Sequence, residues 1–125
     1  MTRRKEMEQA DIVSVPEAEN VFPFSLLETE AYAVWINSIS TPVVKARITI
    51  NVDKMQRGLF GDWKEVGNGV FEMRMDFGPG YRVYYGKREK VVIILLGGGD
   101  KKSQNKDIAN AQQLWKGMKD EITKF

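Results

Sequence analysis

The stretch from Phe71 to Asp100 constrains the fold most, because it predicts three consecutive antiparallel strands. Across residues 71–77, apolar side chains alternate with charged ones, which is typical of a strand with one buried and one polar face. Gly78-Pro79-Gly80 predicts a tight turn, and residues 81–85 resume the alternation. The six apolar residues from Val91 to Leu96 then predict a central strand that is buried on both faces.

The predicted turn also fixes which side chains face each other. A three-residue loop would pair Phe77 with Tyr81, and directly opposed residues of an antiparallel pair share a face. The apolar side chains then meet on one face, which the rest of the chain is expected to cover. On the opposite, outer face this register places Asp76 opposite Arg82 and Arg74 opposite Tyr84.

The size and composition predict one soluble domain. The chain has 125 residues, of which 42% are hydrophobic and 29% charged, and no apolar run approaches the roughly 20 residues that cross a bilayer. Residues 1–20 are polar and predict a tail, so the single domain is expected to span residues 21–125. The first residues lack the apolar stretch of a signal peptide, which favours a cytoplasmic location and no membrane partner.

Cysteine and histidine are both absent. Disulfides and thiolate metal sites are therefore excluded, a zinc site is not expected, and neither is any other metal or cofactor. The net charge is +2, but residues 74–106 contain eight Lys or Arg and three acidic residues. A local basic face of this kind is typical of a protein that binds a polyanion or an acidic partner. The alternative is a solvated charged loop.

Two helices are predicted before the strands. Residues 21–28 are short and β-prone, and Thr29 is a candidate N-cap for a helix that ends near Ser38. Thr41-Pro42 repeats the start signal for a second helix, which is expected to run to about Gln56.

The remaining segments complete the predicted order β-α-α-β-β-β-α. Residues 59–69 contain three glycines and predict a loop, and the apolar stripe in residues 103–125 predicts a C-terminal amphipathic helix. The fold class is therefore α+β: a small twisted antiparallel sheet packed on a two-helix hairpin, with a C-terminal helix. The three tryptophans, Trp35, Trp63 and Trp115, are expected in the core.

The glycine run Gly97-Gly98-Gly99 is not a nucleotide-binding loop. Neither the P-loop spacing GxxxxGK[ST] nor the dinucleotide spacing GxGxxG is present.

Three stretches carry a resemblance to a known family: GDWKEVGNGVFEMRMDFGPGYRVYY, VVIILLGGGDKKSQNKDI and the helix with Trp115. Over residues 21–122 the sequence resembles the RelE/ParE superfamily of toxins from toxin–antitoxin pairs, and most closely its HigB-like branch of phage-derived addiction-module killer proteins. The resemblance implies the same small sheet with two helices behind it. It also implies a cognate antitoxin as partner, expected to be of the helix-turn-helix type.

Many members of this superfamily cleave mRNA, on the ribosome or free of it, without a metal. The resemblance therefore implies an endoribonuclease in which a ribose 2′-OH attacks the adjacent phosphate. By position, Arg82 matches the arginine at the active centre, Arg74 the arginine of the preceding strand, and Lys64 a lysine common in this branch. Arginine suits this task because its guanidinium forks onto phosphate oxygens and stays charged. Candidate contacts for RNA are Lys101, Lys102, Tyr84, Lys87 and Arg88.

The general base is open, because this chain lacks the lysines and the tyrosine that ribosome-dependent members often carry. Lys64, Glu72 and Tyr84 are the available candidates, and no histidine can replace them. Two other functions are compatible with the same resemblance. One is a non-catalytic gyrase inhibitor of the ParE type, and the other is a degenerate toxin that only binds its antitoxin or nucleic acid.

Overall fold

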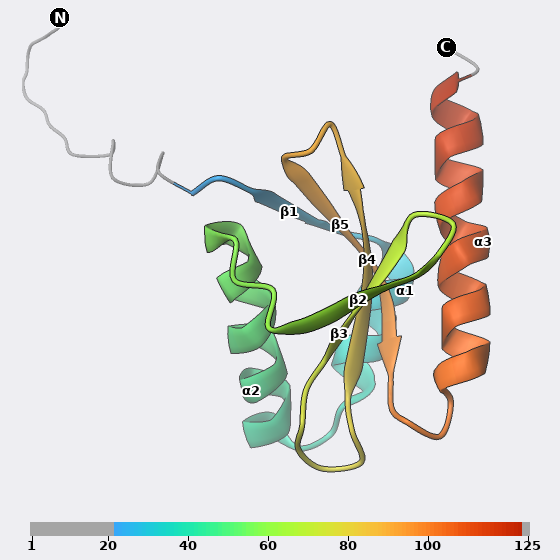
Figure 1. The fold of residues 1–125 in the computed structure, drawn as a ribbon. Coiled ribbons are helices and arrows are strands. Elements are labelled where there is room, and N and C mark those ends of the chain that lie inside the picture. The colour runs from blue at the N-terminus through green and yellow to red at the C-terminus, as the bar shows by residue number, and fades with distance from the viewer. Residues whose placement is uncertain (1–21, 124–125) are drawn as a thin grey trace, which may run out of the picture.

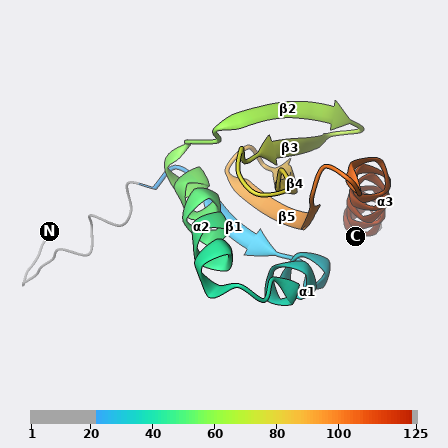
Figure 2. The ribbon, with the colours of Figure 1, turned by 90° about the horizontal axis from the view of Figure 1, so that it is seen from below.

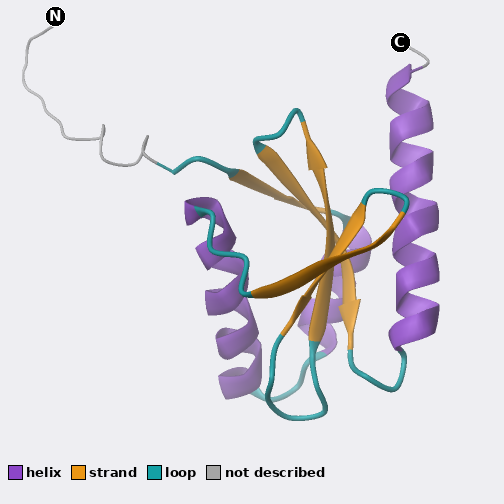
Figure 3. Cartoon of the chain, viewed as in Figure 1, coloured by secondary structure: helices purple, strands orange, loops and turns teal. Residues whose placement is uncertain are grey.

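A computed structural model describes residues 22–123, and in them a five-stranded sheet is combined with three α-helices (Figures 1 and 3). The α+β class is confirmed. The expected tail, residues 1–20, lies outside the described residues. The elements in chain order are β1 (Ser25–Glu28), α1 (Glu30–Ser38), α2 (Pro42–Asp53), the 3-10 helix η2 (Lys54–Arg57), β2 (Asp62–Gly67), β3 (Val70–Arg74), β4 (Arg82–Arg88), β5 (Val92–Gly99) and α3 (Gln104–Thr123).

The sheet is mixed, which corrects the prediction of an antiparallel one. The strand order is β1-β5-β4-β3-β2, and β1 runs parallel to β5 while all other pairs are antiparallel. The elements α1, α2, η2 and β2 to β4 lie between β1 and β5, and they form the long connection that two parallel strands require. Strand β5 has a neighbour on each side, as its apolar run predicted, although the middle position belongs to β4.

The predicted helix boundaries of the helical hairpin are confirmed. Thr29 caps α1, because its Oγ1 accepts a hydrogen bond from the Tyr32 backbone N–H at 3.2 Å and donates one to the Leu95 carbonyl at 2.8 Å. Pro42 occupies the first turn of α2, and the helical segment closes at Gly58, whose φ of 82° is left-handed.

Strand β2 corrects the prediction that residues 59–69 are a loop. Asp62–Gly67 pairs antiparallel with β3, with a bulge between Glu65 and Gly67. Because β2 is an edge strand whose first four residues are exposed, it lacks the buried apolar alternation that marks an interior strand. Gly67 belongs to its bulge, and the turn into β3 contains Asn68 and Gly69, which both have positive φ.

The hairpin of β3 and β4 has a register that differs by two residues from the predicted one. Arg74 lies opposite Arg82, and Glu72 lies opposite Tyr84. The reason is the turn: the Gly80 N–H donates to the Phe77 carbonyl, so Phe77 belongs to the turn and not to the ladder. A shift of two preserves the face of each side chain, so the predicted sides of the sheet are correct although the predicted partners are wrong.

Two separate cores lie on the two faces of the sheet. One core packs α1 and α2 against Met73, Val83 and Tyr85, while the other packs α3 against Tyr84 and Ile94. Figures 1 and 2 show α2 and α3 on opposite sides of the sheet. The outer face of the hairpin is therefore partly covered by α3, which corrects the expectation that it is open to solvent.

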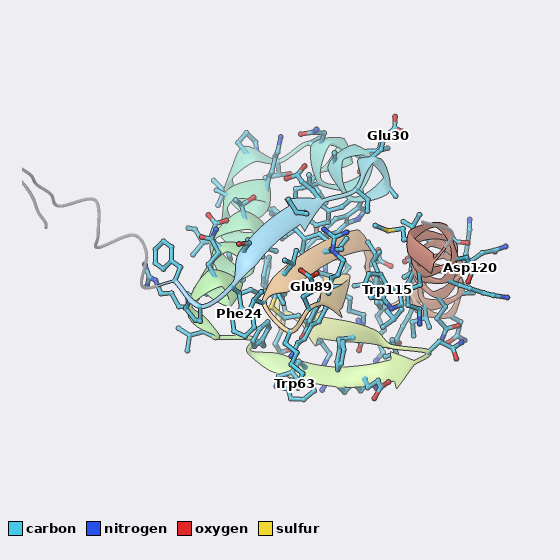
Figure 4. The ribbon with its side chains drawn as sticks, turned by 90° about the horizontal axis from the view of Figure 1, so that it is seen from above. Phe24, Glu30, Trp63, Glu89, Trp115 and Asp120 are labelled. Carbon is cyan, nitrogen blue, oxygen red and sulfur yellow. The ribbon has the colours of Figure 1, made fainter. Side chains whose placement is uncertain are left out.

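Trp115 fixes the position of α3 on the sheet. It is 6% exposed and lies over Gly86 of β4, where a Cβ would come within 2.8 Å of the indole ring. Figure 4 shows Trp115 between α3 and the strands. The absence of a side chain at Gly86 is thus what lets the helix approach the sheet closely. None of the helices in the described part of the chain is long and apolar enough to span a membrane.

The glycine run at the end of β5 has a packing role that substitution can test. The Trp35 ring occupies the space that a Cβ at Gly98 would take, whereas a Cβ at Gly97 would meet nothing within 4 Å. We expect Gly98→Ala to lower the free energy of unfolding in urea by about 1–3 kcal/mol, because it overpacks the contact with Trp35. The matched control Gly97→Ala is expected to change it by less than about 0.5 kcal/mol. Equal effects of the two substitutions would contradict this packing role.

Candidate functional site

The candidate site lies on the face of the sheet that α3 partly covers. The ladder pairs Lys64 of β2 with Glu72 of β3, and Glu72 with Tyr84 of β4. One row further along, Arg74 of β3 lies beside Arg82 of β4. Residues directly opposed across a sheet share a face, so three neighbouring strands contribute to one surface.

A buried polar network forms the inner part of this surface. Glu72 is 1% exposed and Arg82 is 4% exposed, and their Oε2 and Nε atoms lie 3.5 Å apart. The same Oε2 atom accepts hydrogen bonds from Tyr84 Oη at 3.3 Å and from Gln104 Nε2 at 2.8 Å. Burying two charges carries a large desolvation cost, which the additional hydrogen bonds offset in part.

Arg82 is held from a second side by the turn that precedes β4. Its Nη1 donates a hydrogen bond to the Gly80 carbonyl at 2.7 Å. Gly80 has a φ of 81°, and a Cβ there would come within 3.2 Å of the guanidinium and 3.6 Å of the Lys101 side chain. The Lys101 Cβ therefore lies near this turn, and the Lys101 backbone N–H donates a hydrogen bond to the Pro79 carbonyl at 3.4 Å. The Arg82 Nε is buried and has no hydrogen-bond partner of suitable geometry.

Exposed cations surround this network. Arg74 is half exposed and pairs with Asp62, whose Oδ2 lies 2.8 Å from Nη2 and accepts a hydrogen bond from Nε at 2.9 Å. This hydrogen bond raises the pKa of Arg74, which is charged in any case. Lys64 and Lys101 are exposed as well. We call Lys64, Arg74, Arg82 and Lys101 the basic cluster.

The loop into α3 positions the lysines. The Asp100 Oδ1 accepts hydrogen bonds from the backbone N–H groups of Lys102 at 2.9 Å and Ser103 at 3.2 Å. These bonds fix the start of the helix, as an N-terminal cap does, and hold Lys101 and Lys102 at the surface. The lack of a side chain at Gly99 allows α3 to pack closely here, because a Cβ would collide with Asp107.

Tyr84 corrects the expectation of an exposed stacking platform. Its side chain is 0% exposed beneath α3, so it offers no face to an RNA base. Burial, followed by the nearby Glu72 carboxylate, raises the pKa of Tyr84 well above its ordinary value. The phenol stays protonated at neutral pH and donates to Glu72, which leaves Lys64 and Glu72 as candidates for a base.

The remaining predicted contacts lie elsewhere. Lys87 is on the opposite face of β4, where its Nζ lies 5.0 Å from the centre of the Phe60 ring, and Arg88 follows at the end of that strand. The structure therefore brings together Lys64, Arg74, Arg82 and Lys101, but not Lys87 or Arg88. Arg82 pairs with Glu72 and not with Asp76, because of the register of the hairpin.

Gln104 was missed in the sequence, and it links the network to α3. A polar residue in the first turn of an amphipathic helix carries no distinct signal. The pairing of Glu72 could have been predicted in principle, because a carboxylate that is buried in a sheet needs an ion pair or hydrogen bonds. Among the described residues, no group of three or more carboxylates is placed to hold a metal ion.

The buried pair and the exposed pair are expected to contribute differently to stability. Glu72→Ala leaves a guanidinium buried without its carboxylate, so we expect the free energy of unfolding in urea to fall by about 3–5 kcal/mol. Arg74→Ala removes an exposed ion pair from the neighbouring row, and about 1 kcal/mol or less is expected. If both substitutions cost the same small amount, the network does not anchor α3.

Comparison with known proteins gives a relative but no function. No protein-family model matches the chain. A protein of Haemophilus influenzae described as an uncharacterized protein is 43% identical over 86 residues, which cover 69% of this chain and 87% of the relative. Identity at this level over most of both chains establishes common descent. The chain therefore belongs to the same family as this Haemophilus protein.

Proposed function

We propose that the protein is the toxin of a toxin–antitoxin pair and cleaves mRNA. The observation that carries the proposal is the basic cluster: Lys64 and Arg82 are neighbours of Glu72, Arg74 lies one row further beside Asp62, and Lys101 lies at the turn that holds Arg82. Such a cluster suits a phosphate, because guanidinium groups bind its oxygens bidentately and remain charged. The resemblance to RelE/ParE toxins supports RNA as the polyanion.

The reaction is a transfer within the RNA strand. The ribose 2′-oxygen bonds to the adjacent phosphorus, the bond to the 5′-oxygen breaks, and the products are a 2′,3′-cyclic phosphate and a 5′-hydroxyl. A base takes the proton of the 2′-OH, and the departing 5′-oxygen takes up a proton. Neither a redox change nor a second substrate is involved.

The residues of the basic cluster have different roles in the proposed reaction, depending on how exposed they are. Arg74 and Lys101 are exposed and can bind the phosphate from solvent, while Arg82 is fixed by Gly80 and Glu72 and offers a preorganised charge behind them. Preorganised charges stabilise a developing negative charge without reorganisation cost. Lys64 and Glu72, paired across two strands, remain the two candidates for the base.

Burial of Arg82 favours a second candidate function. A guanidinium that is 4% exposed and already paired reaches a phosphate only if Glu72 or α3 yields. A toxin that binds its target through the exposed cations without cleaving RNA, such as a gyrase inhibitor of the ParE type, needs no such access. Both candidates include a cognate antitoxin as the neutralising partner.

Induced expression followed by primer extension on cellular mRNA tests the proposal. We expect new 5′ ends with the wild type and at least about a tenfold loss of cleavage with Arg74→Ala, because one charge-assisted contact to the phosphate is removed. Lys64→Ala is expected to reduce cleavage as well. The matched control is Lys54→Ala, an exposed lysine of η2, which should cleave like the wild type.

Two results would contradict mRNA cleavage, and a third would contradict the proposed site. Intact mRNA together with double-strand DNA breaks would select the gyrase inhibitor. Normal growth on strong expression would select a degenerate toxin. Equal cleavage by Arg74→Ala, Lys64→Ala and Lys54→Ala would place the active site elsewhere.

A further inference from the structure

A row of aromatic rings lies on the other face of β2, β3 and β4. Phe71 stacks on Tyr85 with ring centroids 5.5 Å apart, and Phe60 stacks on Tyr85 at 5.7 Å. Trp63 meets Phe71 edge-on at 5.9 Å, and Phe24 meets Phe60 edge-on at 5.3 Å. We call these five residues the aromatic row. Because Tyr85 is buried, the inner end of the aromatic row is held rigidly.

Trp63 is the exposed end of this row. It was expected in the core, but 51% of its surface is open to solvent, and Figure 4 shows it at the outer margin of the molecule beside β2. Its contact with Phe71 holds the indole in place. A large ring that is fixed on one side and open on the other is a platform for a flat ligand.

A cation accompanies the aromatic row. The Nζ of Lys87 lies 5.0 Å from the Phe60 ring centre, 5.3 Å from that of Phe71 and 6.0 Å from that of Phe24. These contacts are cation–π interactions, which limit the motion of an otherwise exposed lysine. Lys87 and Trp63 both contact Phe71, so a base and a neighbouring phosphate of one short strand can reach both.

Strand β2 separates the aromatic row from the basic cluster. Consecutive residues of a strand point to opposite faces, so Trp63 faces the aromatic row, paired with Met73, while Lys64 faces the basic cluster, paired with Glu72. Strand β2 is also the edge of the sheet, and within the described residues no strand lies beyond it. A single nucleic-acid strand can therefore cross this edge from one face to the other.

We propose that the edge of the sheet at β2 binds an unpaired RNA base, which stacks on Trp63 while a neighbouring phosphate contacts Lys87. The strand then continues over β2 to Lys64 and Arg74. This inference rests on the proposed function for its ligand, and it adds a base-binding element that the basic cluster lacks. Stacking on an aromatic ring beside a cation is how unpaired RNA is commonly bound.

The charges favour RNA over an acidic protein segment as the occupant. An acidic peptide would use Lys87 but stacks on Trp63 only where it carries an aromatic side chain, whereas a nucleotide supplies a ring and a phosphate in each repeat. The turn after Lys87 adds two further cations, Arg88 and Lys90, against one acid, Glu89. The aromatic row thus combines ring faces with the cation of Lys87, which lies against Phe60 and Phe71.

Binding of single-stranded 2′-O-methyl RNA to the full chain, followed by fluorescence anisotropy, tests the inference. This probe lacks the 2′-OH nucleophile and is not cleaved. We expect Trp63→Ala to raise the Kd about fivefold or more and Trp63→Phe to restore most of the affinity. The control is Val43→Ala, a residue of α2 that is 76% exposed, which should bind like the wild type.

Two further measurements separate the base from the phosphate. An abasic strand of the same length should bind wild type and Trp63→Ala equally, because it offers no ring. Lys87→Gln should lower the slope of log Kd against log salt by about 0.7, the value for one phosphate of a single strand.

Unchanged affinity of Trp63→Ala for the 2′-O-methyl probe would overturn the inference, even if the protein cleaves RNA. So would polyglutamate that binds as tightly as the probe and loses affinity equally in Trp63→Ala, since it would identify an acidic protein partner. If the protein binds the probe in a base-dependent way but does not cleave cellular mRNA, the proposed function is overturned and the inference stands.

Discussion

The ion pair between Glu72 and Arg82 is the interaction on which the rest of the structure depends. Both groups are almost completely buried, so each needs the other and further hydrogen bonds to offset its desolvation. Strand β4 supplies the Tyr84 hydroxyl, the hairpin turn supplies the Gly80 carbonyl, and α3 supplies Gln104. The hydrogen bonds of this ion pair therefore link the sheet, the hairpin turn and the C-terminal helix within an otherwise apolar layer.

This arrangement gives the two arginines of the hairpin different properties. Arg74 and Arg82 lie opposite each other, yet the first is half exposed beside Asp62 and the second is fixed beneath α3. An accessible cation can capture a phosphate, and a fixed one can stabilise charge that develops on it. The proposed RNA cleavage uses both properties, whereas a binding-only toxin uses the first alone.

Alternation and caps predicted much of the fold. The strands of the hairpin, the faces of their side chains, the cap at Thr29 and the end of the helical hairpin at Gly58 all follow from local rules that packing does not override. The predicted register of the hairpin differs from the observed one by two residues. The sequence of the Gly78-Pro79-Gly80 turn does not show how many flanking residues belong to the turn. Strand β2 was missed because an exposed edge strand has no buried alternation.

Lys64, Arg74, Arg82 and Lys101 lie on one surface, but the sequence did not reveal what surrounds them. The alternation of side chains along the strands placed Arg74, Arg82 and Tyr84 on one face of the sheet. The sequence did not show that the apolar stripe of α3 packs on that same face. The signal that connects them is Gly86, since a glycine inside a strand often marks a close approach, and here Trp115 occupies the space. That contact predicts that Tyr84, on the same face of β4, is buried.

Arginine side-chain NMR tests most directly whether the basic cluster is the phosphate-binding surface. The Nε–H signals of the full chain are followed while uncleavable 2′-O-methyl RNA is added, and the buried Arg82 Nε without a hydrogen-bond partner is a sensitive reporter. We predict shifts at Arg74 and Arg82 and none at Arg47, which lies over the Phe77 ring. Shifts at Arg47 with unchanged signals at Arg74 and Arg82 would contradict a phosphate site in the basic cluster.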